Sequence, residues 1–143
     1  MNTYEEHLKC REAYKEHGDC TVRALSNLLD CSYGLAHRKL AKYGRPHGRG
    51  TSWDTVEKAC KEICEMKGRT VSWHGYPQYS ARAARFSGYR VQTINQFIRS
   101  NSKGVYLISM CGHVATVVDS EIIDWTASTA GRRQVTGYIK LEG

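Results

Sequence analysis

The segment that decides the fold is GVYLISMCGHVATVVDSEIIDWT, residues 104–126. Its β-branched and aromatic residues fall into three short runs, GVYLISMC, HVATVVD and EIIDWT, with polar or glycine-containing breaks between them. Runs of this kind are typical of β-strands joined by tight turns. A fourth run, QVTGYIKL (134–141), follows farther along the chain. We therefore expect an antiparallel sheet in the C-terminal part of the chain.

The spacing within this segment also predicts which side chains share a face of the sheet. If Val118 and Glu121 flank a two-residue turn, Ala115 pairs with Asp124. Asp124 then lies diagonally across from His113 on the same face, about 7 to 8 Å away at the backbone, a gap that a hydrogen bond between the two side chains can span. A three-residue loop would put Asp124 on the opposite face.

The N-terminal half has helical rather than extended spacing of its apolar residues. In HGDCTVRALSNLL (17–29) an apolar stripe follows Cys20, and Arg23 and Asn27 are expected away from it. Asp19 is expected to cap this helix, its carboxylate accepting backbone N–H groups of the first turn. Further elements are expected as helices at 33–43, from Thr51 or Ser52 to Gly68, and from Thr93, which stands in capping-box spacing with Gln96, and as a strand at TVSWHG (70–75).

The order of these elements predicts the fold class. Helices precede strands rather than alternating with them, so we expect an α+β fold in which N-terminal helices pack against a C-terminal antiparallel β-sheet. The 143 residues are enough for one hydrophobic core and too few for two. A single domain spanning residues 1–143 is therefore expected.

Composition and charge indicate the cellular compartment and the kind of partner to expect. The N-terminal MNTYEEHLKC has no apolar run of signal-peptide length, and no segment is apolar enough to span a membrane, so a cytoplasmic protein is expected. In that reducing compartment the 6 cysteines are expected to be thiols. The formal net charge of +7 favours an acidic partner, a peptide or protein before a nucleic acid.

Cys20 and His113 are the candidate catalytic pair. A thiol in the first turn of a helix is stabilised as a thiolate by the helix dipole, and a neighbouring imidazole completes an ion pair. His113 begins a strand directly after a glycine, so the strand fixes the direction of its ring. The other histidines are expected in helices or polar loops with little to fix them; they are His7, His17, His37, His47 and His74.

The motifs GDCTVRAL, GHVATVVD and IIDW resemble the papain-like cysteine peptidase superfamily, in particular its small bacterial and bacteriophage members similar to the bacteriocin-processing peptidases. The resemblance spans about residues 17–126 through three short matches. It implies a papain-like fold with Cys20 as nucleophile, His113 as general base and acid, and Asp124 as the residue that orients the imidazole. It also implies cleavage of an amide, isopeptide or thioester bond through an acyl-enzyme, without cofactor or metal, in the host cytoplasm if the chain is phage-encoded. Acyl transfer to an amine needs the same residues and stays open.

The chain departs from the family pattern at the oxyanion site. The family commonly has a glutamine a few residues before the nucleophile, and residues 10–19, CREAYKEHGD, contain none. The backbone N–H of Cys20 can supply one donor. His17, Gln92 and Gln96 are open alternatives for the second, so the departure bears on catalytic power more than on fold.

Two alternatives to an enzyme remain. The first is a papain-like binding module, such as a phage-type inhibitor of a host factor, acting through a basic surface that includes GRPHGRG (44–50). The second is a nucleic-acid-binding protein held together by zinc. Its ligands would be Cys60 and Cys64, one helical turn apart, with His74 or Cys31, although both helical cysteines also fit an apolar core stripe.

Overall fold

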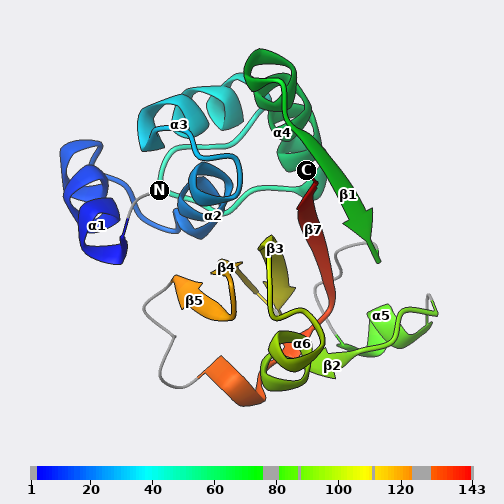
Figure 1. Ribbon diagram of the computed structural model, residues 1–143. Helices are drawn as coiled ribbons and strands as arrows, with labels where there is room; N and C mark the ends of the chain where they lie inside the picture. The colour runs from blue at the N-terminus through cyan, green and yellow to red at the C-terminus, as the bar shows by residue number, and fades with distance from the viewer. Residues whose placement is uncertain (1–2, 76–80, 87, 111, 124–129, 143) are drawn as a thin grey trace. The chain divides into compact units, whose positions relative to one another are not determined.

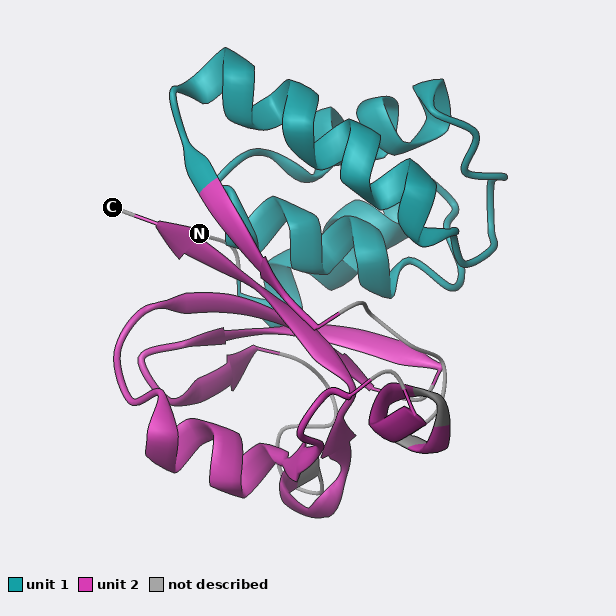
Figure 2. Cartoon of the chain, turned by 90° about the vertical axis from the view of Figure 1, so that its right-hand side faces the viewer, with its two compact units in different colours: residues 1–70, 143 teal, residues 71–142 magenta. Residues whose placement is uncertain are grey.

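The computed structural model describes residues 3–75, 81–86, 88–110, 112–123 and 130–142. It confirms the α+β class, with helices in the N-terminal part and an antiparallel sheet in the C-terminal part (Figure 1). The chain divides into two compact units, Met1–Thr70 and Val71–Glu142, which Figure 2 shows in different colours. Each unit is described by itself below.

The first unit is helical. α3 packs against α1, α2 and α4. Ser32 and Ser52 cap α3 and α4 with their hydroxyls, which accept the backbone N–H of Leu35 and Thr55. Gly68 ends α4 in the left-handed conformation, at φ 63°, as a glycine can do without strain. The helices are α1 (Tyr4–Ala13), α2 (Cys20–Leu28), α3 (Tyr33–Lys42) and α4 (Trp53–Lys67).

The side of α2 that carries Arg23 and Asn27, away from the apolar stripe, is buried as well. Every residue from Thr21 to Leu28 is buried, and Arg23 is only 7% exposed. Arg23 tolerates burial because its Nε donates to the Asp19 carboxylate at 3.1 Å and its guanidinium lies over the Tyr4 ring, 5.5 Å from the ring centre. Asn27 is buried as well. α2 is thus buried on both its apolar and its polar sides.

The second unit contains two sheets. The larger has the strand order β1-β7-β3-β4-β5, and the smaller pairs β2 with β6. The run QVTGYIKL, expected as one strand, is two strands in different sheets. Thr136 separates them, because its N–H and its hydroxyl both bond to Ser109 in β3. The strands are β1 (Thr70–His74), β2 (Gln92–Thr93), β3 (Val105–Met110), β4 (His113–Val118), β5 (Glu121–Ile123), β6 (Gln134–Val135) and β7 (Gly137–Glu142); the helices are α5 (Ala81–Phe86), α6 (Ile94–Ser100) and a 3₁₀ turn at Ala130–Arg132.

α6 supplies the apolar core of this unit together with the sheet. Phe97 of α6 makes edge-on ring contacts with Tyr106 of β3 and Tyr138 of β7 at 5.2 and 4.9 Å between ring centres. The predicted capping box is confirmed, since Thr93 and Gln96 bond each other's backbone N–H. The buried cluster consists of Ile94, Phe97, Tyr106, Ile108, Met110, Ala115, Val117 and Val135.

The predicted two-residue turn between β4 and β5 is confirmed. Val118 pairs with Glu121, and the intervening Asp119 and Ser120 have φ of 45° and 75°, the left-handed pair that suits a tight hairpin. The carboxylate of Asp119 accepts the Gly104 N–H at 2.8 Å, which ties the turn to the start of β3. The observed register runs to Thr116↔Ile123. The predicted partner of Ala115, Asp124, lies outside the described residues.

Candidate functional site

Cys20 is the first residue of α2 and is half-buried. The expectation that the Asp19 side chain caps this helix is wrong, since its carboxylate makes no bond to the first turn. Asp19 has φ −95° and ψ 18°, whereas the capping serines of α3 and α4 are extended. The backbone therefore turns the Asp19 carboxylate away and leaves the first-turn N–H groups to other acceptors.

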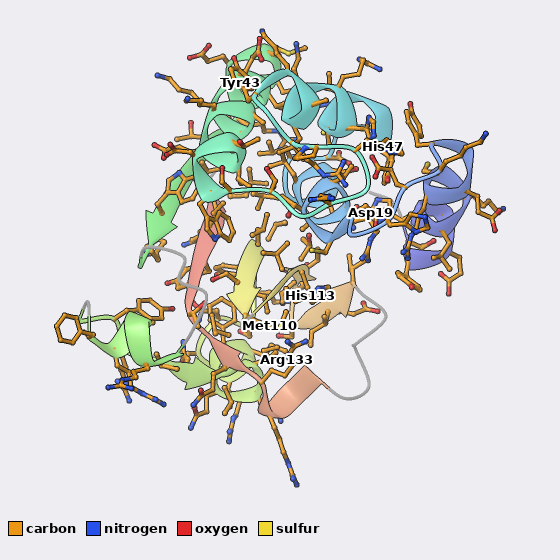
Figure 3. All side chains as sticks on the ribbon, turned by 180° about the vertical axis from the view of Figure 1, so that it is seen from behind. Asp19, Tyr43, His47, Met110, His113 and Arg133 are labelled. Carbon is orange, nitrogen blue, oxygen red and sulfur yellow. The ribbon has the colours of Figure 1, made fainter. Side chains whose placement is uncertain are left out.

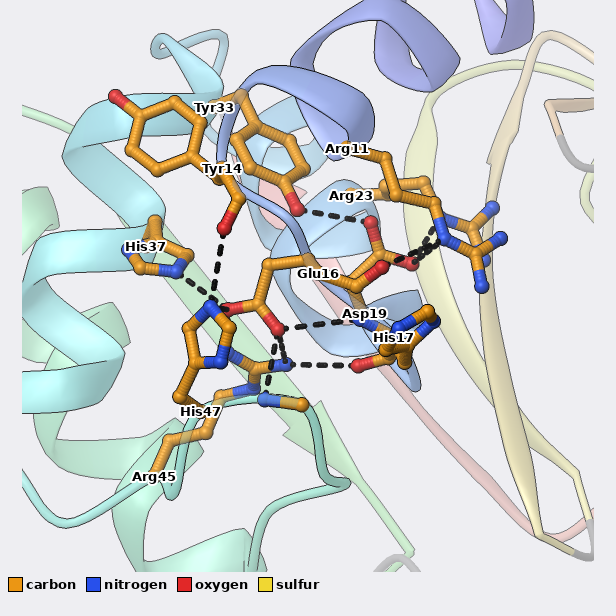
Figure 4. Close-up of polar contacts among 11 residues, drawn as sticks. Arg11, Tyr14, Glu16, His17, Asp19, Arg23, Tyr33, His37, Arg45 and His47 are labelled. Carbon is orange, nitrogen blue, oxygen red and sulfur yellow. Dashed lines mark hydrogen bonds and ion pairs between the residues drawn. The ribbon is translucent and has the colours of Figure 1, made fainter.

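The Asp19 carboxylate is instead the centre of a buried polar network (Figure 4). It accepts hydrogen bonds from Arg23 Nε at 3.1 Å and from the Tyr33 hydroxyl at 2.8 Å, and Arg11 Nε lies 3.9 Å away. Burial and the hydrogen bond to Asp19 raise the pKa of Tyr33, so its hydroxyl stays a donor. Burial and the nearby Arg23 charge lower the pKa of His7 to about 4. The charge directly before Cys20 is thus matched by two guanidinium groups.

His113 begins β4 in the second unit and is half-buried. It pairs with Met110 across the connection from β3. Gly112 has φ 69°, and an added Cβ would meet no atom within 4 Å, so the glycine is required by the backbone conformation rather than by close packing. Figure 3 draws the described side chains as sticks and labels His113.

Of the three predicted triad residues, the structure describes two, and these belong to different units. Cys20 belongs to the first unit and His113 to the second, and each has a defined place at the start of its element. Asp124 lies outside the described residues. Among the alternative oxyanion donors, His17 is exposed in the connection before α2, Gln92 is in β2 and Gln96 belongs to the capping box.

A second polar cluster in the first unit was not predicted from the sequence. Its centre is the buried carboxylate of Glu16. Arg45 donates two hydrogen bonds to it, from Nη1 to Oε2 at 2.8 Å and from Nη2 to Oε1 at 3.1 Å. The backbone N–H groups of Gly48 and His17 donate to Oε1 at 2.8 and 3.3 Å. Burial opposes ionisation of Glu16, but the bonds from Arg45, Gly48 and His37 outweigh it and lower its pKa to about 2.

Two histidines complete this cluster, contrary to the expectation that little fixes them. His37 Nε2, on α3, lies 2.5 Å from Glu16 Oε2. His47 Nε2, in the loop after α3, lies 3.0 Å from the Tyr14 carbonyl oxygen and 3.7 Å from Glu16 Oε2. The contacts join positions 16, 37 and 47, so no local spacing could have revealed them. The composition of the GRPHGRG loop, rich in glycine and basic residues, is the one signal present in the sequence.

The predicted zinc alternative is not assembled among the described residues. The group of three metal-ligating side chains found there is Glu16, His37 and His47, not a set with Cys60 and Cys64. Those two cysteines are buried in α4, in the apolar stripe with Ile63. His74 instead contacts the Ser72 hydroxyl at 2.8 Å and stacks on Tyr138. Cys10, Cys20, Cys31, Cys60 and Cys64 carry reduced thiols.

An exposed basic and aromatic patch lies at α5. Phe86 is 95% exposed, and Arg82, Arg85 and Arg90, near it in the sequence, are exposed too. We refer to these four residues as the α5 patch.

The described residues contain no helix with the length and hydropathy needed to cross a membrane. Comparisons of the chain with models of known protein families, with curated proteins and with solved structures find no match.

Proposed function

We propose that the chain is a papain-like cysteine hydrolase of the cytoplasm that cleaves an amide, isopeptide or thioester bond in a peptide or protein. Cys20 is the nucleophile, His113 the general base and acid, and Asp124 the residue that orients the imidazole. The observation that carries the proposal is the place of Cys20, at the start of α2, with the Asp19 carboxylate directed elsewhere.

The surroundings of Cys20 favour a thiolate. The helix end offers backbone N–H groups and a partial positive charge, worth about 0.3–1 kcal/mol to an anion. The carboxylate that precedes Cys20 would oppose a second negative charge if it were unpaired. Arg23 and Arg11 offset it at 3.1 and 3.9 Å, so the thiolate does not form next to an uncompensated carboxylate.

The β4–β5 hairpin supports the roles of His113 and Asp124. The assignment of both to one face depends on a two-residue turn, which is the turn length observed between Val118 and Glu121. The observed register runs to Thr116↔Ile123, and Asp124 lies outside the described residues.

The reaction then follows in two stages. The Cys20 thiolate adds to the carbonyl carbon, and the oxyanion accepts the N–H of Cys20. The imidazolium of His113 gives its proton to the leaving amine or thiol as that bond breaks, leaving an acyl-thioester on Cys20. His113 next takes a proton from water, the hydroxide adds to the thioester, and the acid product leaves with the thiolate regenerated. No redox step or cofactor enters this scheme.

Alkylation by iodoacetamide, followed for each cysteine by mass spectrometry, tests the nucleophile. Cys20 should keep most of its rate at pH 6. Cys10, a half-buried thiol in α1 with no part in the proposed triad, is the internal control and should keep a smaller fraction of its rate at pH 6 than Cys20 does. His113→Ala should give Cys20 the same pH dependence as Cys10.

A peptide thioester tests turnover. An acyl adduct on Cys20 that decays in water, and that is absent in Cys20→Ser, is the expected product. Equal alkylation profiles of Cys20 and Cys10, with no adduct from any thioester, would contradict the proposal.

The α5 patch favours one second candidate, a binding module for an acidic peptide or protein. The exposed ring of Phe86 offers an apolar contact, and the neighbouring arginines attract carboxylates. Fluorescence anisotropy with a labelled acidic peptide should show binding that Phe86→Ala and Arg85→Ala weaken and that salt reduces. Tighter binding of a single-stranded oligonucleotide of the same charge would instead identify a nucleic-acid surface.

A further inference from the structure

The Glu16 cluster has the donor set of a metal site. Glu16, His37 and His47 each offer one ligand atom, and these three atoms lie within 4.8 Å of one another. Both Nε2 atoms are near Glu16 Oε2, His37 at 2.5 Å and His47 at 3.7 Å. They come from three separate parts of the first unit: the connection between α1 and α2, helix α3, and the loop after α3 (Figure 4). A convergence of this kind is not explained by helix periodicity or by a single turn.

The hydrogen bonds to Glu16 leave one oxygen for a cation. Oε1 receives three donors, from Arg45 Nη2, the Gly48 N–H and the His17 N–H. Among the described residues, Oε2 receives Arg45 Nη1 and contacts the His37 imidazole. A carboxylate oxygen offers two lone pairs. Arg45 takes one of those on Oε2, and the other is the one that the His37 imidazole contacts and that a cation could take.

We propose that Glu16, His37 and His47 bind a single Zn²⁺ ion through Oε2 and the two Nε2 atoms. Two imidazoles and one carboxylate oxygen are a common set for zinc and leave a fourth position for water. Mg²⁺ and Ca²⁺ prefer all-oxygen sets, so the two imidazoles select against them.

Arg45 has a supporting role in this site. The two hydrogen bonds from its guanidinium fix the plane of the Glu16 carboxylate. Residues that bond to a metal ligand without binding the metal commonly orient it in this way. The positive charge of Arg45 also weakens attraction for the ion, so we expect micromolar rather than picomolar binding. Two atoms bound to a tetrahedral Zn²⁺ ion at about 2.0–2.1 Å lie about 3.3 Å apart. His37 Nε2 must therefore move away from Oε2, from 2.5 Å, and His47 Nε2 must move slightly closer than 3.7 Å.

Metal binding must change the hydrogen bonding of His37. Its Nε2 is in hydrogen-bond contact with Glu16 Oε2, and Zn²⁺ binds that nitrogen only through a free lone pair, so the ring proton of the bound state is on Nδ1. The bound ion would join α3 and the loop to the connection that leads to Cys20. The proposal is independent of whether Cys20 is catalytic.

Isothermal titration with ZnCl₂ measures the affinity and the stoichiometry. The wild-type chain should bind one Zn²⁺ ion. His47→Ala should lower the affinity at least tenfold while leaving the buried Glu16–Arg45 pair in place. His17→Ala is the matched control, since it removes an exposed imidazole from the same cluster but keeps the backbone N–H that bonds Glu16.

Co²⁺ substitution distinguishes this site from binding to thiols. We expect visible bands of a nitrogen- and oxygen-ligated ion without the intense thiolate charge-transfer band. Equal Zn²⁺ affinity in wild type and His47→Ala, a thiolate band, or binding of Mg²⁺ as tight as that of Zn²⁺ would each overturn the proposal.

Discussion

Replacement of Glu16 by glutamine should strongly destabilise the first unit. Glutamine keeps the shape of the side chain and loses its charge, which leaves the guanidinium of Arg45 buried without an ionic partner. The pKa of Glu16 falls from 4.5 to about 2. At about 1.36 kcal/mol for each pKa unit, the ionised form stabilises the fold by about 3 kcal/mol. Breaking a buried ion pair has a cost of that order, about 3–5 kcal/mol.

The same shift fixes the pH dependence of the effect. A carboxyl group whose pKa is lowered by folding contributes its full stabilisation above the unfolded value of about 4.5, and the contribution is lost as the pH falls through the folded value of about 2. The stability difference between wild type and Glu16→Gln should therefore be constant from pH 7 to pH 5. It should shrink by about 1.4 kcal/mol for each pH unit between pH 4.5 and pH 2.

Native-state hydrogen exchange of the α2 and α3 amides measures this difference within the first unit, without interference from unfolding of the second. Glu12→Gln is the matched control, because Glu12 is exposed in α1 and the same substitution there should change stability by less than about 0.5 kcal/mol. A Glu16→Gln effect no larger than that of Glu12→Gln, or an effect that does not change with acid, would refute the reasoning.

Three further changes test the local structure by urea unfolding or hydrogen exchange. Gly68→Ala should cost about 1 kcal/mol, because φ is 63° and the surrounding space is open, so strain alone acts; no loss would exclude the left-handed cap. Thr93→Ala removes both the acceptor for Gln96 N–H and the capping box, and should cost about 1 kcal/mol within the second unit only. Tyr33→Phe removes a buried donor to Asp19 and should cost about 1–2 kcal/mol, against no change for the exposed Tyr14→Phe.

Local signals in the sequence predicted most of the elements. Ser52 and Gly68 mark the two ends of α4, and the pair Thr93 and Gln96 marks the start of α6, because capping depends on side chains only a few residues apart. The β4–β5 turn follows from alternation and spacing in the same way. Each of these features depends on residues that are close to one another in the sequence.

The errors come from contacts that join distant residues. Asp19 has the residue type of a helix cap, but buried partners in α2 and α3, Arg23 and Tyr33, compete for its carboxylate. Arg23, expected away from the apolar stripe of its helix, is buried through the same bond to Asp19. The Glu16 cluster is the extreme case, since its members meet only after three segments have folded together.

The central claim, that Cys20 and His113 form a thiolate–imidazolium pair, is tested most directly by an NMR titration of the His113 ring in wild type and in Cys20→Ser. A neighbouring thiolate favours the protonated ring, so the account predicts that the midpoint of the His113 titration is higher in wild type, by one pH unit or more, than in Cys20→Ser. Superimposable titration curves in the two proteins would show that the sulfur and the imidazole do not interact, and would contradict it.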